Sequence, residues 1–113
     1  MTHVVNEVGP TEALDLIDGG AVLVDVREDH EWSAGHAPQA TWMPMDLVPQ
    51  EYQSLATDRP IVCVCHLGSR SAVVAQALRQ AGFDARNLTG GMQAWAEAGL
   101  MVVDTHGDPG TIV

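Results

Sequence analysis

Two short apolar runs, each followed by turn residues and helical spacing, constrain the fold of this chain most. The first run spans residues 21–26 and the second residues 60–65, and β-branched side chains fill much of both. Continuous apolar runs of this length are typical of strands covered on both faces. Because helical patterns separate the strands, the sequence predicts an α/β fold with a central, mostly parallel sheet and helices on both faces.

Proline, glycine and helical periodicity place the other elements. A helix is expected to begin at Pro10 and to end at Gly19. A long helix with an apolar stripe is expected to follow residues 66–70 and to end at Gly82. The shorter elements are expected to be a helix over residues 30–34, a strand over 40–43, a loop over 44–49, helical turns over 51–56, an edge strand over 85–88 and a helix over 92–98.

The length and charge of the chain limit its organisation and partners. At 113 residues it fits one domain, residues 1–113, with a core over about 8–103 and a tail over 104–113 expected on the surface. The net charge is −10, with 15 acidic residues against 5 basic ones. Nucleic acids and anionic membranes attract cationic faces, so neither is an expected partner.

Nothing in the sequence predicts export or membrane insertion. No apolar run approaches the roughly 20 residues that a membrane span requires. The start, residues 1–7, lacks the basic and then apolar order of a secretory signal. A cytoplasmic location is therefore the default expectation.

The two cysteines, Cys63 and Cys65, are separated by one residue. On a strand their Cα atoms would lie about 6.6 Å apart with parallel side chains, which disfavours a disulfide. Cys63 is expected to pack as a small buried apolar residue, with a role as resolving thiol as the lesser alternative. A metal site with His66 is disfavoured, because adjacent residues rarely converge tetrahedrally. No metal and no cofactor is expected.

Cys65 has the sequence context of a reactive thiol. It ends the second apolar strand, and in open α/β sheets sites form where such strands end and the next helix begins. The N–H groups of a tight turn and a helix N-terminus favour a thiolate. Gly68 permits the turn, and Arg70 adds a permanent cation at its rim.

Three segments, in order, resemble the signatures of the rhodanese-like family. The segment from Cys65 to Ser71 resembles its active-site loop, with glycine three and arginine five residues after the cysteine. Residues 23–38 resemble the amino-terminal signature and residues 90–100 the carboxyl-terminal one. The resemblance implies a single rhodanese-like domain of the thiosulfate sulfurtransferase type.

The resemblance also implies a reaction and its residues. Cys65 would take sulfane sulfur from thiosulfate or a persulfide and pass it, as a Cys65 persulfide, to cyanide or a thiol. The binding loop would be formed by His66, Leu67, Gly68, Ser69 and Arg70, with Asp25, Arg27 and Ser71 in support. A cation often follows the cysteine in this family, whereas histidine is mostly neutral at pH 7. A protein or low-molecular-weight persulfide is therefore the expected cellular donor. The protein is expected to be a monomer or a weak homodimer.

Two other functions stay open. The chain also fits a catalytically weak rhodanese-fold module that binds or regulates a partner through its acidic surface. A cysteine-dependent phosphatase or arsenate reductase is the third choice. Such phosphatases have five residues between cysteine and arginine, whereas four separate Cys65 from Arg70.

Several other residues have two interpretations. Asp25 orients Arg70 or accepts an N–H of the turn, or it joins Arg27 in holding the end of the sheet. His36 is expected to be a hydrogen-bonded turn residue. Trp32 and Trp95 are expected in the core or in a satellite of it. Trp42 has the alternative of lining the pocket mouth.

Overall fold

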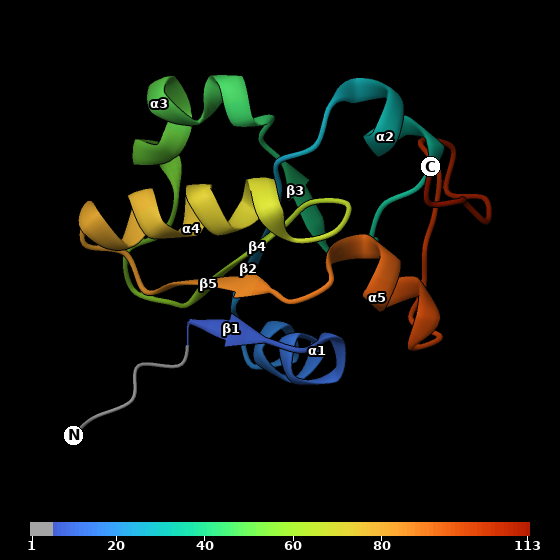
Figure 1. The fold of residues 1–113 in the computed structure, drawn as a ribbon, viewed down its shortest axis with the longest axis horizontal. Helices are drawn as coiled ribbons and strands as arrows, with labels where there is room; N and C mark the ends of the chain where they lie inside the picture. The colour runs from blue at the N-terminus through green and yellow to red at the C-terminus, as the bar shows by residue number, and fades with distance from the viewer. Residues whose placement is uncertain (1–5) are drawn as a thin grey trace.

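The computed structural model describes residues 6–113, which form a five-stranded sheet with helices on both faces (Figure 1). The strand order is β1–β5–β4–β2–β3, and every neighbouring pair is parallel. The α/β fold predicted from the sequence is confirmed. The strands are β1 (Glu7–Val8), β2 (Val22–Asp25), β3 (Ala40–Trp42), β4 (Ile61–Val64) and β5 (Ala85–Leu88).

Two apolar clusters, one on each face, hold the helices to the sheet. Residues of β4 alternate between them: Cys63 packs in the cluster with α4, whereas Val62 and Val64 pack in the cluster with α1 and α5. This alternation follows from the two-residue period of a strand. The helices are α1 (Pro10–Asp18), α2 (Asp29–Ala34), α3 (Val48–Glu51), α4 (Ser69–Gln80) and α5 (Gly91–Glu97), with short 3-10 turns at Met45–Leu47 and Tyr52–Ser54.

Two expectations about the elements are wrong. The strand β5 is not at the edge, because β1 pairs with it in parallel and takes the edge position. At two residues, β1 is too short to leave a periodic pattern in the sequence. The segment 44–49 is not a loop, because helical structure begins at Met45 and continues through α3.

The carboxyl-terminal tail lies against the end of α2. Val103 forms isolated antiparallel bridges with His36 and with Pro109. The N–H of Thr111 donates to the carbonyl of Ala34 at 2.9 Å. The tail therefore fixes the turn after α2, in agreement with its expected surface position.

The described residues bear on the expectation about membrane insertion, but not on most of the expectation about export. Among residues 6–113, no helix is long and apolar enough to cross a membrane. The expectation about a secretory signal depends mainly on residues 1–5, which lie outside the described residues.

Candidate active site

The Cys65 sulfur lies inside the loop that joins β4 to α4. The strand ends at Val64, so Cys65 is the first residue of the loop and not the last of the strand. Gly68 caps the helix with a φ of 111°, a left-handed conformation that glycine adopts without strain. Its N–H donates to Cys65 Sγ at 3.1 Å, and the N–H of Ser71 does so at 3.4 Å. The loop thus surrounds the sulfur with main-chain donors.

Cys65 is more buried than the sequence suggested. The residue is only 1% exposed, so the thiol lies at the bottom of the loop and not at its mouth. The amides of Gly68 and Ser71 nevertheless turn inward, toward Sγ.

The pKa values of the two thiols are shifted in opposite directions by their surroundings. Burial acts to raise the pKa of Cys65, but hydrogen bonds from the Ser71 hydroxyl and from the N–H groups of Ser71, Gly68 and Arg70 lower it below the ordinary value. Burial raises the pKa of Cys63 to about 12. Because the thiolate is the nucleophilic form of cysteine, these pKa shifts favour nucleophilic chemistry at Cys65 over Cys63.

The start of α5 holds the other side of the loop. The N–H of Met92 donates to the Cys65 carbonyl at 2.8 Å, and that of Gln93 to the His66 carbonyl at 3.1 Å. This contact is so close that a Cβ on Gly91 would overlap both carbonyls. The glycine pair in the third sequence signature therefore lets the helix N-terminus bind the loop.

Asn87 and Glu7 complete the surroundings of the loop, and sequence reasoning missed both. Asn87 Nδ2 donates to the Gly68 carbonyl at 3.0 Å and to the Glu7 carboxylate at 3.1 and 3.2 Å. Its Oδ1 accepts the Ser71 hydroxyl at 2.6 Å, and Ser71 Oγ lies 3.2 Å from Cys65 Sγ. No local pattern marks these contacts, because strands β1 and β5 bring the residues together.

Arg70 is held by Glu31 of α2, a third residue that sequence reasoning missed. Two hydrogen bonds of 2.8 Å join Nη1 to Oε1 and Nη2 to Oε2. Hydrogen bonds from Arg70 outweigh burial and bring the pKa of Glu31 down to about 2, and those with Glu31 raise the pKa of Arg70. The expected rim cation is therefore neutralised by a carboxylate.

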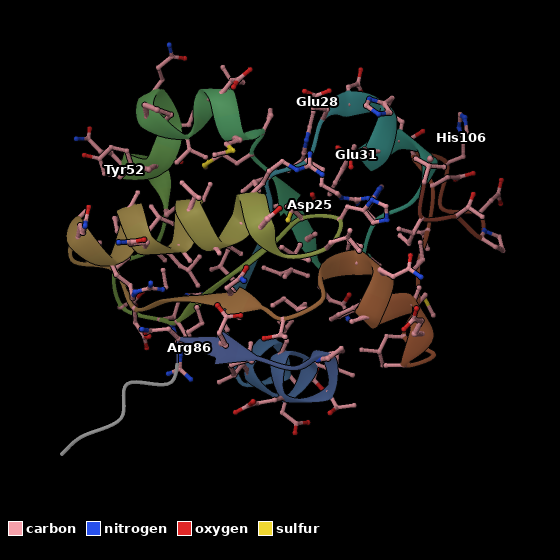
Figure 2. All side chains as sticks on the ribbon, viewed as in Figure 1. Asp25, Glu28, Glu31, Tyr52, Arg86 and His106 are labelled. Carbon is pink, nitrogen blue, oxygen red and sulfur yellow. The ribbon has the colours of Figure 1, made fainter. Side chains whose placement is uncertain are left out.

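Asp25 does not orient Arg70, which corrects one expectation. Both oxygens of its carboxylate accept hydrogen bonds from Arg27, at 2.7 to 3.1 Å, and both residues are fully buried. Arg27 also donates to the carbonyls of Gly35 and Glu31. The pair thus attaches α2, and with it Glu31, to the end of β2 (Figure 2).

The aromatic residues lie beside the site and not within it. Trp95, a residue of α5, is fully buried. Trp32 stacks on His36 at 3.6 Å between ring centroids, and His36 Nδ1 donates a hydrogen bond to the Trp32 carbonyl at 2.7 Å. Trp42 is 36% exposed and donates through Nε1 to the Arg27 carbonyl at 2.8 Å. These contacts agree with the structural interpretation of Trp32, Trp95 and His36.

A cavity of about 100 Å³ meets the loop at Arg70. Two carboxylates, Glu28 and Asp46, line it, and Glu28 lies near Glu31 at the start of α2 (Figure 2). The remaining wall is apolar. The cavity is lined by Val26, Glu28, Pro44, Met45, Asp46 and Arg70.

The fold and the loop together define a class: α/β proteins that present a cysteine within a ring of main-chain amides at the end of a central strand. A family model described as rhodanese-like domain matches residues 9–98, and the chain belongs to this family. The Bacillus subtilis protein YtwF is 41% identical over 73 residues, which cover 65% of this chain and 71% of that protein. A sulfurtransferase of Allochromatium vinosum is 38% identical over 87 residues, covering 76% and 81%.

Solved structures agree with this assignment. The crystal structure of a rhodanese-related protein from Thermoplasma volcanium has a TM-score of 0.81 at 26% identity and covers 87% of this chain and 97% of that one. The family and the named relatives together support a sulfurtransferase-type role.

Proposed function

We propose that this protein transfers sulfane sulfur through a persulfide on Cys65. The observation that carries the proposal is the set of donors around Cys65 Sγ: two N–H groups and the hydroxyl of Ser71 within 3.4 Å. These donors favour the thiolate and stabilise negative charge on a second sulfur in the loop. The proposed site comprises Cys65, the loop 66–70, and Ser71.

The proposed reaction has two balanced steps. The Cys65 thiolate attacks the outer sulfur of thiosulfate, the sulfur–sulfur bond breaks, and sulfite leaves with the bonding electron pair. An acceptor thiolate, or cyanide, then attacks the terminal sulfur of the persulfide and regenerates the Cys65 thiolate. Both leaving groups are stable anions, so the reaction needs no strong general acid.

Mass spectrometry tests the proposal directly. Incubation with a donor should add about 32 Da, one sulfur atom, to the wild-type protein and nothing to Cys65→Ala. Cys63→Ala is the matched control and should still gain the sulfur, because Cys63 lies outside the loop and is fully buried. A gain that persists in Cys65→Ala would refute the role of Cys65.

The electrostatics of the cavity favour a persulfide over thiosulfate as donor. Glu31 already balances the charge of Arg70, and Glu28 and Asp46 add negative charge beside it. A dianion is repelled there, whereas a persulfide carries less charge. Added salt should therefore speed loading from thiosulfate by screening the repulsion. If micromolar thiosulfate saturated the rate of sulfur loading, and did so at a lower concentration than any persulfide, this preference would be contradicted.

The two other functions have simple tests. A folded wild-type protein that gains no sulfur from thiosulfate or persulfide would favour the interaction module. Hydrolysis of p-nitrophenyl phosphate that depends on Cys65 would favour the phosphatase. The four-residue spacing between Cys65 and Arg70 supports neither phosphate nor arsenate chemistry.

A further inference from the structure

Three carbonyls of the loop point outward, and each has a donor outside the loop. Main-chain amides at the start of α5 hold the carbonyls of Cys65 and His66. The third carbonyl, that of Gly68, accepts from the N–H of Ala72 within α4 at 3.2 Å and from a side chain outside it, Asn87 of β5, at 3.0 Å. This third contact is therefore the one that depends on the identity of a residue.

The direction of the Gly68 carbonyl affects the donors inside the loop. A trans peptide unit is planar, so a carbonyl and the N–H of the next residue point in opposite directions. With its carbonyl turned toward Asn87, the peptide after Gly68 directs the N–H of Ser69 away from Asn87. The N–H of Gly68 itself donates to Cys65 Sγ at 3.1 Å. Asn87 thus helps to fix the backbone that supplies the amides.

Asn87 also holds the hydroxyl that reaches the sulfur. Its Oδ1 accepts the Ser71 hydroxyl at 2.6 Å and shares the single hydroxyl proton with Cys65 Sγ, which lies 3.2 Å from Ser71 Oγ, so this contact keeps the Ser71 side chain beside the sulfur. The Glu7 carboxylate accepts from its Nδ2, so both donors and the acceptor of the amide have partners. With Asn87 only 3% exposed, these contacts leave its side chain one orientation.

We propose that Asn87 is a positioning residue for sulfur transfer, which acts on Cys65 through the Gly68 carbonyl and the Ser71 hydroxyl. This inference rests on the proposed function of Cys65. Without Asn87, the N–H of Ala72 alone holds the Gly68 carbonyl, and the Ser71 side chain loses the partner that keeps it beside the sulfur. The donors would then stabilise both the thiolate and the persulfide less well.

Asn87→Thr is the first test, because threonine suits a strand, adds no charge and is too short to make both contacts. We expect the Cys65 thiolate, followed by its ultraviolet absorbance, to titrate at a higher pH than in wild type. Loading from a persulfide donor at neutral pH should slow about tenfold, the effect of one lost hydrogen bond. Thr89→Val is the matched control: it removes a contact with Glu7 but touches no loop residue.

A purely structural role for Asn87 would lower the melting temperature and leave both the titration and the loading unchanged, which would overturn the proposal. If Asn87→Thr does not fold, Asn87→Asp, which keeps the shape of the side chain, replaces it. Its charge affects the thiol directly, so the measurement is hydrogen exchange at the Gly68 amide, expected about tenfold faster. Unchanged exchange would also overturn the proposal.

The two proposals fail in different ways. If the wild-type protein takes up no sulfur, sulfur transfer is wrong, yet the thiolate titration still tests the action of Asn87 on Cys65. If wild type loads normally and folded Asn87→Thr matches it in titration and loading, only the positioning role is wrong.

Discussion

Arg70 and Glu31, 39 residues apart in the chain, are joined by two parallel hydrogen bonds of 2.8 Å. Arg70 lies in the first turn of α4, directly after the loop around Cys65, and Glu31 lies on α2, which Arg27 attaches to the end of β2. Two-point pairs of this kind fix orientation as well as distance. The active-site segment, residues 65–71, thus depends on the amino-terminal signature segment, residues 23–38, for its shape.

The ion pair predicts a pH-dependent stability. The folded-state pKa of Glu31, about 2, lies below its ordinary 4.5, so the stabilisation is complete above pH 4.5 and is lost as the pH falls toward 2. We expect wild type to exceed Glu31→Gln in free energy of unfolding by about 2 kcal/mol at pH 7. Urea unfolding at several pH values should show this difference shrinking in acid. The exposed Glu97→Gln is the control, and a difference that stays constant down to about pH 2 would be inconsistent with the ion pair.

The hydroxyl of Ser71 predicts the acidity of the thiol. The rate of alkylation of Cys65 should rise with pH and reach half its maximum below the ordinary thiol value of 9.0. Ser71→Ala should move this midpoint upward by about one pH unit, because one donor to the thiolate is lost. The exposed Ser54→Ala should leave it in place. If Ser71→Ala leaves the midpoint unchanged, the Ser71 hydroxyl does not lower the pKa of Cys65.

The two cysteines should differ in reactivity. Burial raises the pKa of Cys63 to about 12, and its side chain has no solvent exposure. Native protein treated with iodoacetamide near pH 8 should therefore be labelled at Cys65 alone, and unfolded protein at both cysteines. Peptide mapping gives the answer, and early labelling of Cys63 in native protein would count against the packing described for β4.

The contact between α5 and the loop predicts a difference between two glycines. Gly91 and Gly99 both have positive φ, 62° and 78°, but only at Gly91 would a Cβ meet the carbonyls of Cys65 and His66. Alanine at Gly99 should cost about 1 kcal/mol of stability, the backbone strain alone. Alanine at Gly91 should cost more, by about 2 kcal/mol, and should also slow sulfur loading. Equal effects in thermal unfolding would show that the close approach is unimportant.

The buried pair of Asp25 and Arg27 predicts a large loss of stability on mutation. Asp25→Ala leaves the guanidinium of Arg27 buried without its carboxylate, which typically costs about 3–5 kcal/mol. The matched exposed pair is Asp84 with Arg86, where Asp84→Ala should cost less than about 1 kcal/mol. Denaturant unfolding compares the two, and similar costs would argue against a structural role for Asp25.

The sequence predicted those parts of the fold and site that depend on neighbours in the chain. The apolar run of β4, the turn after Cys65 and the helix that follows are local, and the structure contains all three, although β4 ends at Val64 and not at Cys65, and α4 begins at Ser69 and not after Arg70. The edge strand β1 has two residues and exists because β5 offers a pairing edge. Its absence from the prediction is also the reason that β5 was placed at the edge.

The missed site residues are those that reach the loop from elsewhere in the fold. Asn87 comes from β5 and Glu31 from α2, and neither residue type is unusual at its place in the sequence. Asp25 was given a possible contact with Arg70 because both ends of the strands share one edge of the sheet. Arg27 lies closer to it and takes both carboxylate oxygens. Side-chain competition of this kind has no signature in a single sequence.

Apart from the Ser71 hydroxyl, it is the backbone of the loop and not its side chains that faces the sulfur. Leu67 is 64% exposed and Ser69 is also exposed, whereas His66 is partly so. Substitutions at these three positions therefore leave the donors to Cys65 Sγ in place and change only the outer surface of one short turn.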